Sequence, residues 1–126
     1  MDADEQLIRR IYDRFNARDM EAVLAMLADD VAWVNGMEGT HEHGPAAVRA
    51  YWTHQWSVID PHVEPLGIAR AADGALVVEV HQVVRDLAGQ VLIDEPVRHA
   101  FRLEGGRVRR FDILGDTQLT GLHPPA

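Results

Sequence analysis

A histidine on an otherwise apolar strand face is the first feature of this sequence that could do chemistry. In the segment VRHAFRL, residues 97–103, strand alternation puts Val97, His99, Phe101 and Leu103 on one face. An imidazole in apolar surroundings can act as a general acid, a general base or a hydrogen-bond donor near neutral pH. The residues alone leave a second interpretation open, in which His99 is a core residue satisfied by its own neighbours.

Asp112 is a second candidate, because it lies across a predicted hairpin from His99. Its direction depends on strand parity. If Phe111 and Ile113 face the interior, Asp112 faces outward; the opposite register turns Asp112 inward but also buries Arg110. A bulge would be needed to settle the parity in favour of an inward Asp112.

The segment AWVNGMEGTHEHG, residues 32–44, contains further polar candidates. Trp33 and Asn35 share a predicted strand face, and an asparagine there can orient a carbonyl or hydroxyl group. The segment from Glu38 to His43 is expected to form a mobile rim. His41, Glu42 and His43 could ligate a metal ion, but without a secure third partner a solvated loop is favoured, and we predict no metal site.

Composition excludes several classes of function. The chain has 126 residues, 47% of them hydrophobic, which is enough for one domain, 1–126, with a loose tail at about 116–126. The absence of cysteine excludes disulfides and thiolate chemistry, and a formal net charge of −8 makes nucleic-acid binding unexpected. With no long apolar run or signal segment, we expect a cytoplasmic protein without a membrane partner.

Hydrophobic spacing predicts helices first and a meander of strands afterwards. Apolar residues recur at helical spacing near the start of the chain, again after Asp19, and again after Gly44. Period-two patterns dominate the second half, where His81 falls on the polar face. This order is typical of an α+β fold. The predicted helices are 4–17, 19–27 and one starting at 45, and the predicted strands are 31–35, 63–70, 75–85, 90–104 and 107–114.

Three segments resemble the SnoaL-like branch of the NTF2-like superfamily, which contains ketosteroid isomerases and polyketide cyclases. They are FNARDMEAVLAMLADDVAWVN at 15–35, HGPAAVRAYW at 43–52 and VRHAFRLEGGRVRRFDI at 97–113. The resemblance implies a cone-shaped α+β barrel, with N-terminal helices packed in a curved, mostly antiparallel sheet. It also implies an apolar pocket and a homodimer formed through the outer sheet face.

The resemblance also implies which residues of this sequence occupy the functional positions of the family. The carboxylate base of ketosteroid isomerases falls on Asn35, whose amide cannot take a proton at neutral pH, so steroid isomerisation by that route is not expected. The oxyanion tyrosine falls on Ile11, beside Tyr12, and the second oxyanion-hole acid falls on His99. Polyketide cyclases pair an aspartate with a histidine on neighbouring strands, as Asp112 and His99 would.

We therefore predict a protein that binds a small apolar molecule bearing a carbonyl or hydroxyl group, with no cofactor. Isomerase- or cyclase-type proton transfer would use His99, with Asp112 as a second acid or base. The alternative is a non-catalytic binding or dimerisation module. An epoxide hydrolase or dehydratase would need an Asp-Arg-Asp or a His-Asp set inside the pocket. Strand parity does not supply the first set, and it supplies the second only if Asp112 turns inward. The predicted ligand contacts are Asn35, Trp33, Tyr12, Phe15, Tyr51, Trp52, Trp56, Phe101 and Phe111.

Overall fold

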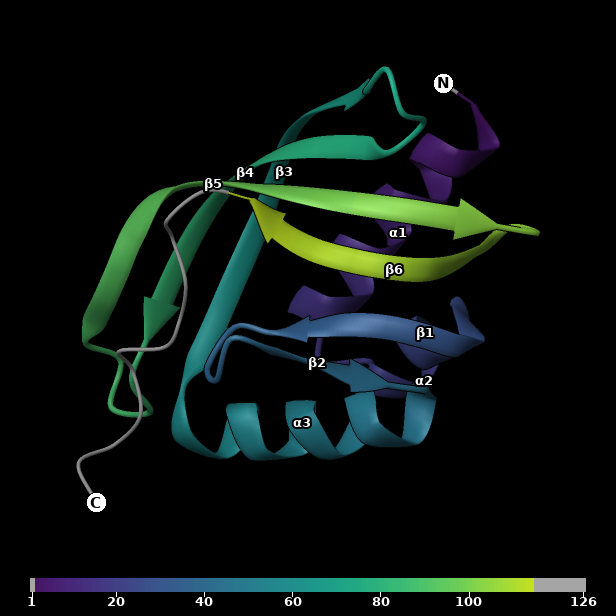
Figure 1. Ribbon diagram of the computed structural model, residues 1–126. Coiled ribbons are helices and arrows are strands. Elements are labelled where there is room, and N and C mark those ends of the chain that lie inside the picture. Colours follow the sequence, from purple (N-terminus) through teal and green to yellow (C-terminus); the bar gives the residue numbers. More distant parts are fainter. Residues whose placement is uncertain (1, 115–126) are drawn as a thin grey trace.

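The computed structural model describes residues 2–114 and begins with two helices (Figure 1). Helix α1, Ala3–Asn16, starts at Asp2, whose side chain accepts a hydrogen bond of 2.8 Å from the backbone N–H of Glu5. This confirms the predicted first helix and its cap. Helix α2, Met20–Leu24, is capped by Asp19 and is shorter than predicted. Both helices bury one apolar side, and α1 thereby directs Ile8, Ile11 and Tyr12 into the interior.

Strand β1, Leu27–Asn35, is followed by a short strand that the sequence pattern did not predict. Strand β2, Thr40–His43, pairs antiparallel with β1, so that Asn35 lies opposite Thr40. The expectation of a mobile rim at 38–43 is therefore wrong for 40–43. The strand was not recognised because it is an edge strand of four residues without apolar alternation, stabilised by pairing with β1.

Helix α3, Pro45–Val58, begins after Gly44, whose φ of 86° is a conformation that favours glycine. Proline at the first helical position needs no backbone partner there. The buried side chains of α3 are Val48, Tyr51, Trp52 and Gln55, which form the stripe expected from their spacing.

The four remaining strands complete one curved sheet with α1 and α3 on its concave side (Figure 1). They are β3, Asp60–Arg70; β4, Leu76–Arg85; β5, Val91–Glu104; and β6, Arg107–Leu114. The strand order is β2-β1-β6-β5-β4-β3, and every neighbouring pair is antiparallel except β1 and β6. This confirms the predicted α+β fold with a curved, mostly antiparallel sheet.

Strand alternation decides which side chains reach the interior. In β4 the even-numbered residues, such as Val78 and Val80, are buried, while His81 is exposed as predicted. His99 and Phe101 of β5 are buried on the same concave face, beside Phe111 of β6. Register shifts in the β3–β4, β4–β5 and β5–β6 pairs add local bending, which helps the sheet to curve around the helices.

No helix within residues 2–114 is long and apolar enough to cross a bilayer. The tail predicted at about 116–126 lies outside the described residues.

Candidate functional site

A cavity of about 70 Å³ lies on the concave side of the sheet, between it and helices α1 and α3. Its wall is mainly aromatic and aliphatic, and among the described residues none of the lining side chains is an aspartate, glutamate, lysine or arginine. The wall therefore suits an uncharged, largely apolar molecule. The lining residues are Ile11, Tyr12, Phe15, Trp33, Val34, Tyr51, Trp52, Gln55, Pro61, Val63, Gln82, His99, Phe101, Phe111 and Ile113.

His99 is the titratable imidazole of this cavity. Its side chain is 4% exposed, and its Nδ1 lies 2.7 Å from the hydroxyl oxygen of Tyr12. Burial lowers the pKa of His99 from 6.5 to about 3 and raises the pKa of Tyr12. Both groups are therefore neutral near pH 7, and one of two arrangements joins them: the Tyr12 hydroxyl donates to Nδ1, or Nδ1–H donates to the hydroxyl oxygen. A neutral imidazole that accepts at Nδ1 carries its proton on Nε2.

Stacked and edge-to-face rings form the wall beside His99. The ring of Phe111 is 4.8 Å from that of His99 and 4.1 Å from that of Trp33, and Trp33 is 5.2 Å from Trp52, measured between centroids. Such packing holds each ring in one orientation. The polar group of His99 is therefore held on a rigid apolar wall.

A second polar pair lies on α3. The Tyr51 hydroxyl oxygen accepts a hydrogen bond of 2.9 Å from Nε2 of Gln55 and another of 3.2 Å from the backbone N–H of Gly36. Burial raises the pKa of Tyr51, so this hydroxyl is also neutral. Gln55 is 4% exposed, and its Oε1 is buried without a partner among the described residues.

Asn35 is buried but is not among the residues that line the cavity. Its Oδ1 accepts hydrogen bonds of 3.0 Å from the backbone N–H groups of Met37 and Glu38, and its Nδ2 donates to Glu42 at 3.3 Å. The side chain thus fixes the turn between β1 and β2. Strand parity correctly placed it on the inward face, but its hydrogen bonds are used by the turn.

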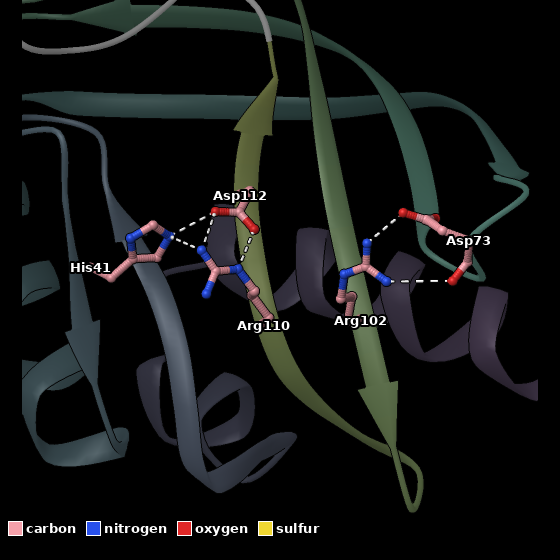
Figure 2. Close-up of polar contacts among 5 residues, drawn as sticks. All are labelled: His41, Asp73, Arg102, Arg110 and Asp112. Atoms are coloured by element: carbon pink, nitrogen blue, oxygen red, sulfur yellow. Dashed lines mark hydrogen bonds and ion pairs between the residues drawn. The ribbon is translucent and has the colours of Figure 1, made fainter.

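Asp112 faces away from the cavity, which corrects its predicted pairing with His99. It points to the convex side of the sheet, where its carboxylate lies 2.7 Å from Nε2 of His41 and 2.7 Å from Nε of Arg110 (Figure 2). The physical reason is parity: Asp112 is paired with Ala100, and the neighbours that face inward are Phe111 and Ile113.

The charge of Asp112 is stabilised on that outer face. Partial burial acts to raise the pKa of the carboxyl, but hydrogen bonds from Arg110 and His41 outweigh it and hold the pKa below its usual value. On the same side, Arg102 forms an ion pair of 2.6 Å with Asp73 (Figure 2). These side chains are a polar network of the outer sheet face.

Residues 8–111 match the family model of the SnoaL-like domain. The chain belongs to the SnoaL-like family. A comparison with curated proteins found no match.

Several solved structures have the same fold as this SnoaL-like protein. An NTF2-like protein of unknown function from Burkholderia pseudomallei is 29% identical, with a TM-score of 0.80 and 92% of each chain covered. TerC, co-crystallised with polyporic acid, is 24% identical, with a TM-score of 0.79, covering 91% of this chain and 92% of TerC. A Mycobacterium tuberculosis protein in complex with estradiol-17beta-hemisuccinate is 15% identical, with a TM-score of 0.78 over 92% and 95% of the chains.

Most of the predicted contacts of the SnoaL-like protein lie in the cavity wall. Asn35 and Trp56 are the exceptions. Trp56 packs on Phe15 and Trp52, and the guanidinium of Arg18 lies over it, 5.1 Å from the ring centroid. That any of the predicted residues contacts a ligand stays a prediction. The predicted residues found in the wall are Tyr12, Phe15, Trp33, Tyr51, Trp52, His99, Phe101 and Phe111.

Two glutamines of the wall were not among the predicted ligand contacts. Gln55 and Gln82 are 4% and 5% exposed, and both line the cavity. A signal for Gln55 existed: it follows Tyr51 by one helical turn on the buried stripe of α3. Gln82 has the even parity of the buried residues of β4, which was also readable from the alternation.

The described residues contain no group of three or more histidine, aspartate and glutamate side chains placed to hold a metal ion. His41, which was weighed as a metal ligand, is bonded to Asp112 instead.

Proposed function

We propose that this SnoaL-like protein binds an uncharged, largely apolar small molecule whose carbonyl or hydroxyl oxygen accepts a hydrogen bond from His99. One observation carries the proposal: the cavity wall is aromatic and aliphatic, and its polar side chains are all neutral groups. A charged ligand would lose its hydration there without meeting an opposite charge. A neutral ligand with a few oxygen atoms would lose little hydration free energy on entering the cavity.

His99 is suited to donate rather than to accept. We infer that the Tyr12 hydroxyl, 2.7 Å from Nδ1, donates to that nitrogen, which places the ring proton on Nε2. No described residue bonds to Nε2, and His99 lines the cavity. A ligand oxygen near Nε2 would therefore receive a hydrogen bond from a donor whose orientation is fixed by Tyr12.

The fold supports this proposal through its relatives. TerC was co-crystallised with polyporic acid, and the Mycobacterium tuberculosis protein was crystallised with a steroid ester. Proteins of this fold thus bind small ring compounds that carry oxygen groups, which supports ligand binding and leaves the charge of this chain's ligand to the cavity wall. Their low identity gives no reason to transfer either ligand to this chain.

Proton transfer on the bound molecule is the second candidate function. Its support is the direct contact of His99 with a second proton-bearing group, Tyr12. Against it stands the cost of charging the imidazole: a pKa lowered from 6.5 to about 3 corresponds to roughly 5 kcal/mol of free energy. A substrate that became anionic beside His99 would offset part of this cost. Binding without turnover needs no such compensation.

We also propose that the protein is a cytoplasmic homodimer formed through the outer sheet face. The support is a set of ion pairs on that face, such as Arg102 with Asp73 at 2.6 Å, which is compatible with a polar interface. Light scattering after gel filtration tests the dimer, and cell fractionation tests the location. A monomer at micromolar concentration would contradict the first.

The binding proposal is tested by the thermal midpoint of the purified protein against steroids, aromatic polyketides, terpenoids and short acyl compounds. A ligand at about a hundred times its dissociation constant adds roughly 2.7 kcal/mol of stability, a shift of several degrees for a domain of this size. We expect a shift for one class of neutral compound. Flat midpoints with every class, in a folded protein, would contradict the proposal.

Variants separate binding from turnover. His99→Gln should weaken the binding of any compound that shifts the midpoint, whereas the exposed-residue control His54→Gln should leave it unchanged. Exchange of the compound's carbon-bound protons for deuterium, followed by NMR, reports proton transfer. Binding without exchange supports a binding protein, and exchange that His99→Gln abolishes supports the enzyme.

A further inference from the structure

The Gln55 amide is a buried polar group with unused hydrogen-bonding capacity. Its Nε2 donates to the Tyr51 hydroxyl at 2.9 Å, but its Oε1 has no partner among the described residues. Buried amide oxygens are almost always hydrogen-bonded, because water is lost on burial and must be replaced. Since Gln55 lines the cavity, a molecule bound there is a candidate partner.

The Tyr51 hydroxyl also has an unused hydrogen-bonding position. Its oxygen accepts from the backbone N–H of Gly36 and from Gln55, so its own hydrogen has no partner among the described residues. If the Gln55 amide is turned over, Tyr51 donates to Oε1 and the Gln55 NH₂ group becomes free instead. In both orientations the pair offers a donor, and in the first it also offers an acceptor.

The pair lies on a different wall from His99. Tyr51 and Gln55 belong to α3, whereas His99 belongs to β5, across the rings of Phe111, Trp33 and Trp52. An apolar stretch therefore separates the two groups of polar atoms. A ligand that satisfies both needs an apolar middle and an oxygen atom at each end.

A third neutral polar group lies in the wall at some distance from His99. His99 is opposite Val78 in the β4–β5 pairing, and Gln82 lies four residues farther along the same face of β4. This is about 13 Å along the strand. Gln82 is thus a second amide that could contact the far end of a ligand, and the test must distinguish it from Gln55.

We infer that Gln55 and Tyr51 form a second hydrogen-bonding subsite, which takes a hydroxyl group at the end of the ligand remote from His99. A hydroxyl matches the pair because it can donate to the free amide oxygen and accept from the free phenol hydrogen. The inference rests on the proposed function, and it narrows the ligand class to elongated aromatic or alicyclic molecules with an oxygen at both ends. Gln55 and Tyr51 are then specificity-determining residues.

Matched pairs of probes test the subsite. One pair is para,para′-biphenol, with a hydroxyl at each end, and para-phenylphenol, which lacks one of them; a naphthalene diol and a naphthol form a shorter pair. Calorimetric titration of the full chain measures each affinity. We expect the wild type to prefer at least one diol over its mono-ol by roughly tenfold.

Gln55→Met keeps the length of the side chain and removes both polar atoms. We expect it to abolish the preference for the diol over the mono-ol. Gln82→Met should keep the preference, as should the exposed-residue control Gln90→Met. Without ligand, the thermal midpoint of Gln55→Met should change little, because loss of the hydrogen bond to Tyr51 is offset by removal of an unpartnered buried oxygen. Tyr51→Phe is the second variant and should reduce the preference in the same direction.

Three results would overturn the inference. They are equal binding of diol and mono-ol by the wild type, a preference that survives in Gln55→Met and Tyr51→Phe, and a preference that only Gln82→Met removes. A loss of both affinities together with a lowered midpoint in Gln55→Met would show a merely structural role. Failure of the folded wild type to bind any probe would contradict the proposed function itself, so the two failures are distinguishable.

Discussion

The hydroxyl oxygen of Tyr12 lies 2.7 Å from Nδ1 of His99, and the planes of the two rings are within 2° of parallel. The contact joins helix α1 to strand β5 in the buried interior. It gives the imidazole a partner on one nitrogen and leaves the other nitrogen without one among the described residues. The direction of the hydrogen bond therefore determines what the cavity offers to a ligand.

Tyr12→Phe should destabilise the protein and disturb the His99 tautomer. The substitution leaves Nδ1 of a buried imidazole without its donor, at a cost of about 1–3 kcal/mol. Chemical denaturation measures the loss. The control is the same substitution in a variant that already lacks the imidazole: in the His99→Leu background, Tyr12→Phe should cost clearly less, and equal costs would show that the contact contributes nothing.

Stability should fall as the pH falls from about 6.5 towards 4.5. The pKa of His99 is lowered to about 3 in the folded state, so between this value and the ordinary value of 6.5 the unfolded chain binds more protons. This difference removes roughly 2–3 kcal/mol of stability by pH 4.5, whereas above about pH 7 the group contributes no further slope. Denaturant titrations across this range measure the effect.

The pH slope can be assigned to His99 by substitution. His99→Gln should flatten the slope between pH 6.5 and 4.5, and the exposed-residue control His54→Gln should retain it. Below about pH 4, carboxylates such as Asp112, whose pKa is held low by Arg110 and His41 against the effect of burial, add losses of the same sign. A wild type whose stability is constant between pH 6.5 and 4.5 would mean that His99 is not desolvated.

Asp112→Asn should leave ligand affinity within about twofold of the wild type, because the carboxylate is on the convex face. Its loss weakens a partly exposed ion pair with Arg110, which is worth less than about 1 kcal/mol. Titration with any compound that shifts the thermal midpoint measures the affinity. Loss of binding by tenfold or more would place Asp112 in the functional site after all.

Asn35→Ala should destabilise the turn between β1 and β2 by about 1–2 kcal/mol. Two backbone N–H groups lose the side-chain acceptor that caps them. Asn35→Asp keeps an acceptor for them but places a carboxylate beside Glu42, which now receives a hydrogen bond from the asparagine. We expect neither variant to gain isomerase activity, and deuterium exchange into a ketosteroid by Asn35→Asp would contradict this.

Much of the fold could be predicted because alternation and caps are local signals. Asp2 and Gly44 set helix starts, and the period-two pattern of β4 placed His81 on the outside. Strand β2 could not be read from its own residues, because pairing with β1 holds it in place. Edge strands of this kind depend on tertiary context.

The site was predictable where a side chain's direction was enough. His99 and the aromatic residues of the wall other than Phe111 follow from strand and helix periodicity, and they line the cavity. Hydrogen-bond partners were harder to predict. Tyr12 contacts His99 across 87 residues of sequence, and Asn35 bonds to its own turn instead of lining the cavity. Hydrogen-bond partners depend on distances that no spacing rule supplies. Asp112 shows that alternation within one strand does not say which of its two faces is inward. Only the register between β5 and β6 decided the direction of this side chain.

The most direct test of the central claim is NMR of the imidazole nitrogens of His99 at neutral pH, with and without a bound neutral probe. We predict a neutral ring protonated on Nε2 and accepting at Nδ1, and a downfield shift of the Nε2 proton when the probe's oxygen binds. A ring protonated on Nδ1, a charged imidazolium, or an Nε2 signal that no bound probe moves would contradict the account.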